Sequence, residues 1–104
     1  MVLRTACIQF APEKAQTERN LDRIALHAKQ AIEEGAQLIV FPETATSGYF
    51  LEGGVEQAAL TALHLHALLS ARLSPWPEGV RIVIGHYERG AAGEVFNSAT
   101  LLMR

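Results

Sequence analysis

Cysteine is almost missing from this sequence, which holds only Cys7 in 104 residues. A single thiol excludes a disulfide within the chain and any metal cluster that needs several cysteines. Long apolar runs are missing as well, because the longest, such as residues 38–41, fall far short of the ~20 residues that span a bilayer. The N-terminus also lacks the apolar core of a signal peptide. These absences predict a cytoplasmic protein without a membrane span.

An excess of charge of one sign is also missing. Nine Lys and Arg residues stand against eleven Asp and Glu residues, for a net charge of -2, and the basic residues are scattered along the chain. Nucleic acids and anionic membrane surfaces are bound by clustered basic side chains. We therefore expect neither a nucleic acid nor a membrane as a partner.

The composition itself is that of an ordinary globular domain, with 49% hydrophobic and 19% charged residues. A chain of this length can bury a modest hydrophobic core. No internal repeat or low-complexity segment divides it. Residues 1–104 are therefore expected to form at most one domain.

Apolar spacing predicts a strand and then a helix in the first third of the chain. Residues 3–10 are rich in strand-forming side chains and suit a buried strand. In residues 17–34 the apolar side chains recur every three or four positions, which is the stripe of an amphipathic helix. Thr17 or Asn20 could cap the start of this helix. Gly35 follows its last turn, where a left-handed backbone favours glycine, so the helix is expected to end there.

The remaining segments complete an α/β pattern. A continuous apolar run at residues 37–41 is too short for a helix and predicts a buried strand, parallel to the first in a βαβ unit. Residues 44–54 have the composition of a loop, in position to form a pocket wall. Residues 55–72 have the spacing of a second helix, and residues 80–87 and 95–103 predict a hairpin of two strands. The expected fold class is α/β with the order β-α-β-α-β-β.

Glu43 is the residue best placed for chemistry, because it follows the predicted strand at residues 37–41. In open α/β sheets, ligands bind in the crevice beyond the carboxyl ends of the strands. The aromatic side chains of Phe41, Tyr49 and Phe50 could partly remove this carboxylate from water, which would suit it to act as a general base. The residue pattern alone leaves open a second interpretation, a solvated glutamate that caps the next turn.

Several segments resemble, in the same order, the nitrilase superfamily of carbon-nitrogen hydrolases. The most specific is the run Gly-Ala-Gln-Leu-Ile-Val-Phe-Pro-Glu at residues 35–43, which is similar to the family's signature around its catalytic glutamate. The other matching segments are Ala6-Cys7-Ile8-Gln9, Asn20-Leu21, Gly48-Tyr49, Ile82-Val83-Ile84-Gly85, Glu88-Arg89 and Phe96-Asn97-Ser98-Ala99. Their spacing over the whole chain argues against a chance match.

The resemblance implies the N-terminal part of a nitrilase-like α-β-β-α sandwich. It also implies hydrolysis of a nonpeptide carbon-nitrogen bond in a small amide, carbamoyl or nitrile substrate, without a metal or an organic cofactor. The family uses a Glu as general base, a Cys that attacks the carbon, and a Lys that stabilises the developing negative charge. Glu43 matches the Glu. Tyr49 and Phe50 are expected to line the substrate pocket, with plain core filling as the alternative, and Asn97 to make structural hydrogen bonds near it.

The family's Lys and Cys fall beyond the last residue, so the chain alone is expected to be inactive. Cys7 is not a substitute, because its place within the first predicted strand indicates an inert residue of the core. Lys14 and Lys29, the only lysines, are expected to be solvated. His64 and His66 are two positions apart, which places them on different faces of a helix, so no metal site is expected.

Two other hypotheses remain for the chain as a whole. It could be a noncatalytic binding or assembly module that keeps half of the nitrilase fold and pairs with a polypeptide carrying the missing residues. It could also be an unrelated flavodoxin-like domain, but residues 11–14 lack the glycine loop expected after the first strand. The sheet edge and face left uncovered by the last strand predict self-association or a homo-oligomer.

Overall fold

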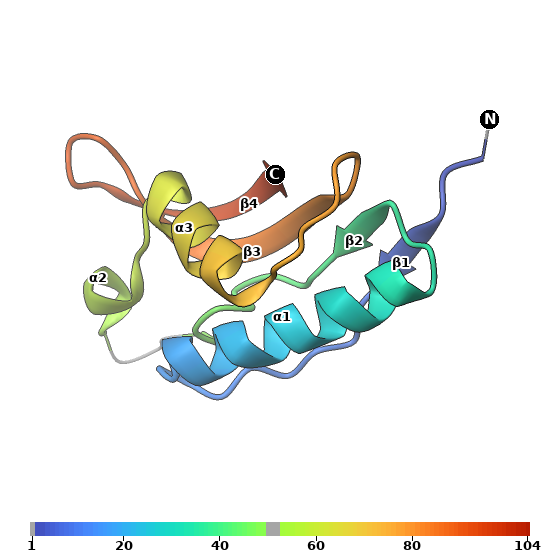
Figure 1. Ribbon diagram of the computed structural model, residues 1–104. Coiled ribbons are helices and arrows are strands. Elements are labelled where there is room, and N and C mark those ends of the chain that lie inside the picture. The colour runs from blue at the N-terminus through green and yellow to red at the C-terminus, as the bar shows by residue number, and fades with distance from the viewer. Residues whose placement is uncertain (1, 50–52) are drawn as a thin grey trace.

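The computed structural model describes residues 2–49 and 53–104, and the predicted alternation of strands and helices is confirmed (Figure 1). The elements are β1 (Thr5–Cys7), α1 (Thr17–Glu33), β2 (Leu38–Val40), α2 (Val55–Ala58), α3 (Ala62–Arg72), β3 (Arg81–Arg89) and β4 (Val95–Met103). The first two strands are shorter than predicted, and β3 extends two residues further. The fold class is α/β, as the sequence indicates.

The four strands form one mixed sheet in the order β1-β2-β3-β4. Both β1 and β3 pair with β2 in parallel, while β3 and β4 form the predicted antiparallel hairpin. The register places Ala6, Ile39, Ile82 and Leu102 side by side across the sheet. The predicted parallel pair joined by α1 is therefore confirmed.

The ends of α1 differ in how well the sequence indicates them. Gly35 has a φ of +88°, and this left-handed residue follows the helix as expected. Neither of the caps predicted for its start is correct, because Gln16 precedes the first turn and makes no side-chain cap bond. Asn20 is buried within the helix, where its amide contacts the backbone of Glu13 and donates to the Thr46 carbonyl oxygen at 3.0 Å. It therefore joins the β1–α1 connection to the loop that follows β2.

The second predicted helix is broken into α2 and α3, so the prediction of one continuous helix was wrong. The break lies at Leu60, which pairs with β3: its N–H donates to the Tyr87 carbonyl at 3.0 Å, and its carbonyl accepts from the Arg89 N–H at 3.0 Å. Thr61 then caps α3, because its hydroxyl oxygen accepts from the His64 N–H at 3.0 Å. Pairing with a distant strand outweighs the local helical spacing here.

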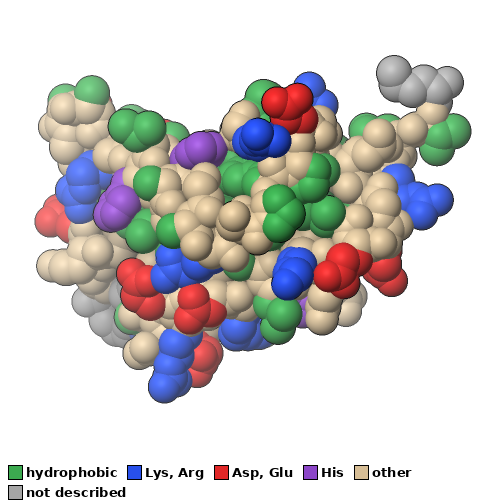
Figure 2. Space-filling model, viewed as in Figure 1, with side chains coloured by type: hydrophobic (Ala, Val, Ile, Leu, Met, Phe, Trp, Pro, Cys, Tyr) green, Lys and Arg blue, Asp and Glu red, His purple; other side chains and the backbone are tan. Residues whose placement is uncertain are grey.

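Among the described residues, the core lies on the face of the sheet that the helices cover. Buried residues of α1 and α3, among them Leu21 and Leu65, pack with Ile39 and Ile82 of the sheet. In Figure 1 both helices lie on the same side of the strands. Figure 2 shows that acidic and basic side chains are mixed along the outer side of α1 on the face drawn, so charge of one sign does not gather there.

The opposite surface of the sheet has no helix over it among the described residues, and we call it the open face. One of its rows is Cys7, Val40, Val83 and Leu101, in register across the four strands. Cys7 is exposed there. The prediction that it is a buried core residue was therefore wrong, because its strand is covered on one face and Cys7 points to the other.

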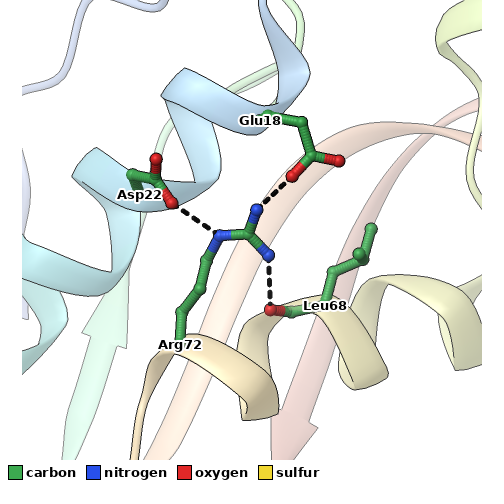
Figure 3. A network of polar contacts seen from close by, with 4 residues as sticks. All are labelled: Glu18, Asp22, Leu68 and Arg72. Carbon is green, nitrogen blue, oxygen red and sulfur yellow. Dashed lines mark hydrogen bonds and ion pairs between the residues drawn. The ribbon is translucent and has the colours of Figure 1, made fainter.

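A guanidinium group joins the two long helices at the surface (Figure 3). Arg72 of α3 donates to the Asp22 carboxylate at 2.8 Å and to the Glu18 carboxylate, both on α1, and to the Leu68 carbonyl at 2.9 Å. Exposed ion pairs of this kind stabilise a fold by at most about 1 kcal/mol each. The apolar contacts between helices and sheet therefore carry most of the packing. None of the helices in the described part of the chain is long and apolar enough to cross a membrane.

Candidate active site

The turn that carries Glu43 lies against β3 because Gly85 leaves room for it. The chain leaves β2 with the Phe41 N–H donating to the Val83 carbonyl at 2.8 Å, and the Ala45 N–H donates to the Gly85 carbonyl at 2.8 Å. A Cβ atom on Gly85 would lie 2.4 Å from the Pro42 carbonyl oxygen and 2.6 Å from the Glu43 Cα. A glycine at this position therefore allows the backbone around Glu43 to approach the strand.

The residue after Glu43 is held in a strained conformation. Thr44 has a φ of +50°, which is unusual for a residue with a branched Cβ. Its side chain is buried, and its hydroxyl has no hydrogen-bond partner among the described residues. Strain and unpaired polar groups of this kind persist where the surroundings fix the backbone, and they cluster at functional sites. The strain at Thr44 thus marks the Glu43 turn as a candidate site.

Each oxygen of the Glu43 carboxylate accepts a hydrogen bond from a described residue. The Asn97 amide of β4 donates to Oε1 at 3.1 Å, and the Tyr49 hydroxyl donates to Oε2. The hydrogen bond to the carboxylate, together with partial desolvation, raises the pKa of Tyr49 above its ordinary value. The phenol therefore stays neutral and remains a donor. Two neutral donors, one from the loop after β2 and one from β4, thus orient Glu43.

A hollow of about 360 Å³ opens beside this carboxylate. It is lined by Phe10, Pro12, Lys14, Pro42, Glu43, Thr44, Gly48 and Tyr49. Size and position suit a small substrate. Glu43 itself is exposed, Tyr49 is 56% exposed and Phe41 is buried in the core, so the described aromatic residues do not remove the carboxylate from water as expected. The third aromatic of that prediction, Phe50, lies outside the described residues.

Lys14 is the residue of this site that the sequence analysis missed. It is exposed, as expected of a solvated residue, and it also lines the same hollow as Glu43. A signal was present in the sequence, because Lys14 follows the first strand as Glu43 follows the second, and the carboxyl ends of parallel strands meet at one edge of a sheet. Lys29 is exposed on α1, as expected.

The remaining candidates lie elsewhere. His66 Nε2 donates a hydrogen bond to the Met103 carbonyl oxygen at 2.8 Å, and the imidazole stacks on Trp76. His64 is exposed on α3. Among residues 2–49 and 53–104, no group of three or more His, Cys, Asp or Glu side chains is arranged to hold a metal ion. Neither histidine lines the hollow, so Glu43 remains the candidate for chemistry there.

Comparisons with known proteins agree with the resemblance read from the sequence. A family model described as carbon-nitrogen hydrolase matches residues 4–104. A curated relative described as a nitrilase, from Paraburkholderia phymatum, is 44% identical over 43 residues, which are 41% of this chain and 13% of that protein.

Solved structures share the fold. The chain is similar to a glutamine-dependent NAD+ synthetase from Acinetobacter baumannii, solved in complex with adenosine diphosphate, with a TM-score of 0.76 and 26% identity over 97% of this chain and 19% of that one. A glutamine-dependent NAD(+) synthetase from Cytophaga hutchinsonii gives a TM-score of 0.72 at 18% identity over 97% of this chain and 17% of that one. At this low identity the similarity shows a shared fold and nothing more. This chain thus spans less than a fifth of the length of each of these relatives. Because one family model matches nearly all of its residues, the chain belongs to the carbon-nitrogen hydrolase family.

Proposed function

We propose that Glu43 is the general base in the hydrolysis of a nonpeptide carbon-nitrogen bond. The observation that carries the proposal is its carboxylate, oriented by two donors beside a hollow at the carboxyl end of β2. A general base has to lie within hydrogen-bond reach of the proton that it takes. Glu43 meets the hollow directly, so a group bound there can give it a proton.

The proposed mechanism uses a Glu, a Lys and a Cys. Glu43 takes the proton of a cysteine thiol, and the resulting thiolate attacks the carbon of the substrate to form a covalent intermediate. A lysine stabilises the negative charge that develops on the substrate. Cys7 lies on the open face and Lys29 on the outside of α1, so neither is placed for these roles. Lys14 lines the hollow, but the family resemblance places the catalytic lysine after the fourth strand. We propose that polypeptide outside these 104 residues supplies both groups, and that the 104-residue chain alone is inactive.

The proposed substrate is a small amide, carbamoyl compound or nitrile that binds in the hollow, with Tyr49 as part of its wall. One relative with a similar structure is described as glutamine-dependent. Glutamine carries a primary amide, so it is the first substrate to test. The hydrolase that carries this chain can be tested for release of ammonia from glutamine, from a carbamoyl compound and from a nitrile. The three rates would rank the three classes of substrate.

The second candidate is a noncatalytic module that binds or assembles with another polypeptide. The open face favours it, since Leu101 and Met103 are 51% and 47% exposed there. Exposed apolar side chains on a sheet face mark interaction surfaces. The two candidates differ in one respect that can be measured, namely whether activity depends on the Glu43 carboxylate.

The test is Glu43→Gln in the hydrolase that carries this chain. The amide is nearly isosteric but cannot accept the thiol proton, so kcat/KM should fall by at least the ~10²–10⁴-fold typical of a general base. Glu78→Gln is the matched control, because Glu78 is exposed in the loop before β3 and is not among the described residues that line the hollow, so this variant should keep full activity. A Glu43→Gln enzyme that retains more than about a tenth of kcat/KM, a loss under ~1.4 kcal/mol, would show that Glu43 is not the base.

A further inference from the structure

We propose that Asn97 is a positioning residue that fixes one oxygen of Glu43 and so directs the other, Oε2, to take the proton. The proposal rests on the proposed role of Glu43 as a base. Its starting observation is the 3.1 Å hydrogen bond between the Asn97 amide and Glu43 Oε1, which joins residues 54 positions apart.

The sheet register explains why Asn97 reaches this carboxylate. Gly85 pairs with Ala99 and Tyr87 pairs with Asn97, so Asn97 is the diagonal neighbour of Gly85 on the open face. The backbone around Glu43 lies directly on Gly85. A side chain one strand over and two residues along is therefore within reach of Glu43. The continuous pairing of β3 with β4 fixes the position of Asn97 relative to Gly85.

The two donors are held differently. Asn97 belongs to a regular strand, and it is not among the described residues that line the hollow. Tyr49 belongs to the loop after β2, lines the hollow and is 56% exposed. Oε1 is thus on the strand side of the carboxylate and Oε2 on the side of the hollow.

The chemistry of the two donors decides which oxygen is protonated. A carboxylate only accepts hydrogen bonds, so the NH₂ group of Asn97 has to face Oε1, and that group cannot accept a hydrogen bond in return. A proton on Oε1 would point at this N–H group and find no acceptor there. A phenol both donates and accepts, so Tyr49 can rotate its hydroxyl and accept from a newly protonated Oε2. The thiol S–H bond breaks, the Oε2–H bond forms, and Tyr49 accommodates the change.

The experiment measures kcat/KM against pH for the hydrolase that carries this chain. Asn97→Ala removes the donor and should lower kcat/KM by about 10- to 100-fold, as a displaced catalytic group does. Asn97→Asp keeps the shape but sets a second carboxylate against Glu43. Like charges disfavour ionisation, so the acidic limb of the profile should move up by about one pH unit or more.

Gln37→Glu is the matched control, since it also exchanges an amide for a carboxylate. Gln37 lies at the opposite end of β2, and its side-chain oxygen accepts from the Arg4 N–H, which a glutamate can still do. This control should leave both the rate and the acidic limb unchanged. Thermal unfolding of each variant, measured alongside, shows how much folded enzyme the rates represent.

The outcomes separate this inference from the proposed function. Asn97 variants within about twofold of wild type, or rate losses that match lost folded enzyme with an unmoved acidic limb, would overturn the role of Asn97. If the Asn97 variants gave that result while Glu43→Gln was inactive, Glu43 would still be the base and only the positioning role of Asn97 would be overturned. An active Glu43→Gln enzyme would overturn both. An acidic limb of the kcat/KM profile that moves to higher pH in a fully folded Asn97→Asp enzyme supports the inference.

Discussion

A single hydrogen atom at Gly85 decides how closely the Glu43 turn approaches β3. Gly85→Ala would place a carbon 2.4 Å from the Pro42 carbonyl oxygen and 2.6 Å from the Glu43 Cα. Both neighbours are backbone atoms, so the turn has to move away from the strand. We expect kcat/KM of the proposed hydrolase to fall by about 10- to 100-fold, and the free energy of unfolding to fall by about 1–3 kcal/mol from overpacking. Steady-state kinetics and thermal unfolding measure the two effects.

Gly79→Ala separates displacement of Glu43 from general destabilisation. Gly79 has a φ of +84°, and a Cβ there would meet nothing within 4 Å. Alanine at this position costs about 1–2 kcal/mol because its backbone is left-handed, but it leaves the Glu43 turn untouched. Stability should therefore fall while kcat/KM holds. Equal losses of activity in both variants would mean that stability, and not the position of Glu43, explains the Gly85 result.

At the scale of elements, the β3–β4 hairpin contains a buried imidazole. His86 is fully buried and contacts the Thr100 hydroxyl at 2.7 Å and the Tyr87 carbonyl at 3.1 Å. Burial lowers the pKa of His86, and this outweighs the opposing effects of the Tyr87 carbonyl and of Glu88. The folded hairpin therefore holds His86 in its neutral form around neutral pH.

The lowered pKa of His86 predicts a loss of stability in acid. An unfolded histidine has a pKa of about 6.5, so the unfolded chain binds a proton before the folded one. The stability that neutral His86 provides is complete above about pH 6.5 and is lost as the pH falls below it toward the lowered pKa. Each unit of lowering corresponds to about 1.4 kcal/mol. The free energy of unfolding, measured with urea at pH 7.5 and at pH 5, should decrease more between these two pH values for wild type than for His86→Gln.

His64→Gln is the control for this experiment, because His64 is exposed on α3. It should keep the wild-type pH dependence, including the contribution of carboxylates that titrate in the same range. An identical decrease in wild type and His86→Gln would show that His86 does not sense pH. The comparison between the two variants isolates the buried imidazole.

Local patterns predicted those elements whose neighbours along the chain determine them. The stripe of α1, its end at Gly35 and the apolar strand before Glu43 all follow from residues a few positions apart. The helix break at Leu60 does not, because its hydrogen bonds are with β3. The exposure of Cys7 likewise depends on which face of the sheet is covered. Both wrong predictions concern features that depend on contacts between segments far apart in the sequence.

The candidate site divides along the same line. Its position was predictable, because Glu43 directly follows a short apolar run that reads as a buried strand. The contact with Asn97 was not, because it depends on the register between β3 and β4 and on the space at Gly85. Lys14 lies between these cases: the first predicted strand places it near the same sheet edge, but no spacing in the sequence shows that it lines the hollow.

At the scale of the whole molecule, a layer of helices covers one face of the sheet, and the open face carries apolar side chains. Val40 and Val83 are partly exposed there, and Leu101 is 51% exposed. The short β1 also leaves an edge that is paired on one side only. Uncovered sheet faces and edges bind other protein surfaces. We therefore predict that the 104-residue chain associates with itself through the open face.

Leu101→Glu tests this prediction against a matched leucine. A charge at Leu101 places a carboxylate in the middle of the open face, where association would have to bury it, so the sedimentation coefficient should stop rising with concentration. Leu63→Glu makes the same exchange on α3, where the leucine is 81% exposed, and should leave association unchanged. If exposed apolar area in general drove association, the more exposed Leu63 would have the larger effect. A wild-type chain that sediments as one monomer at all concentrations and unfolds sharply at high temperature would contradict the prediction.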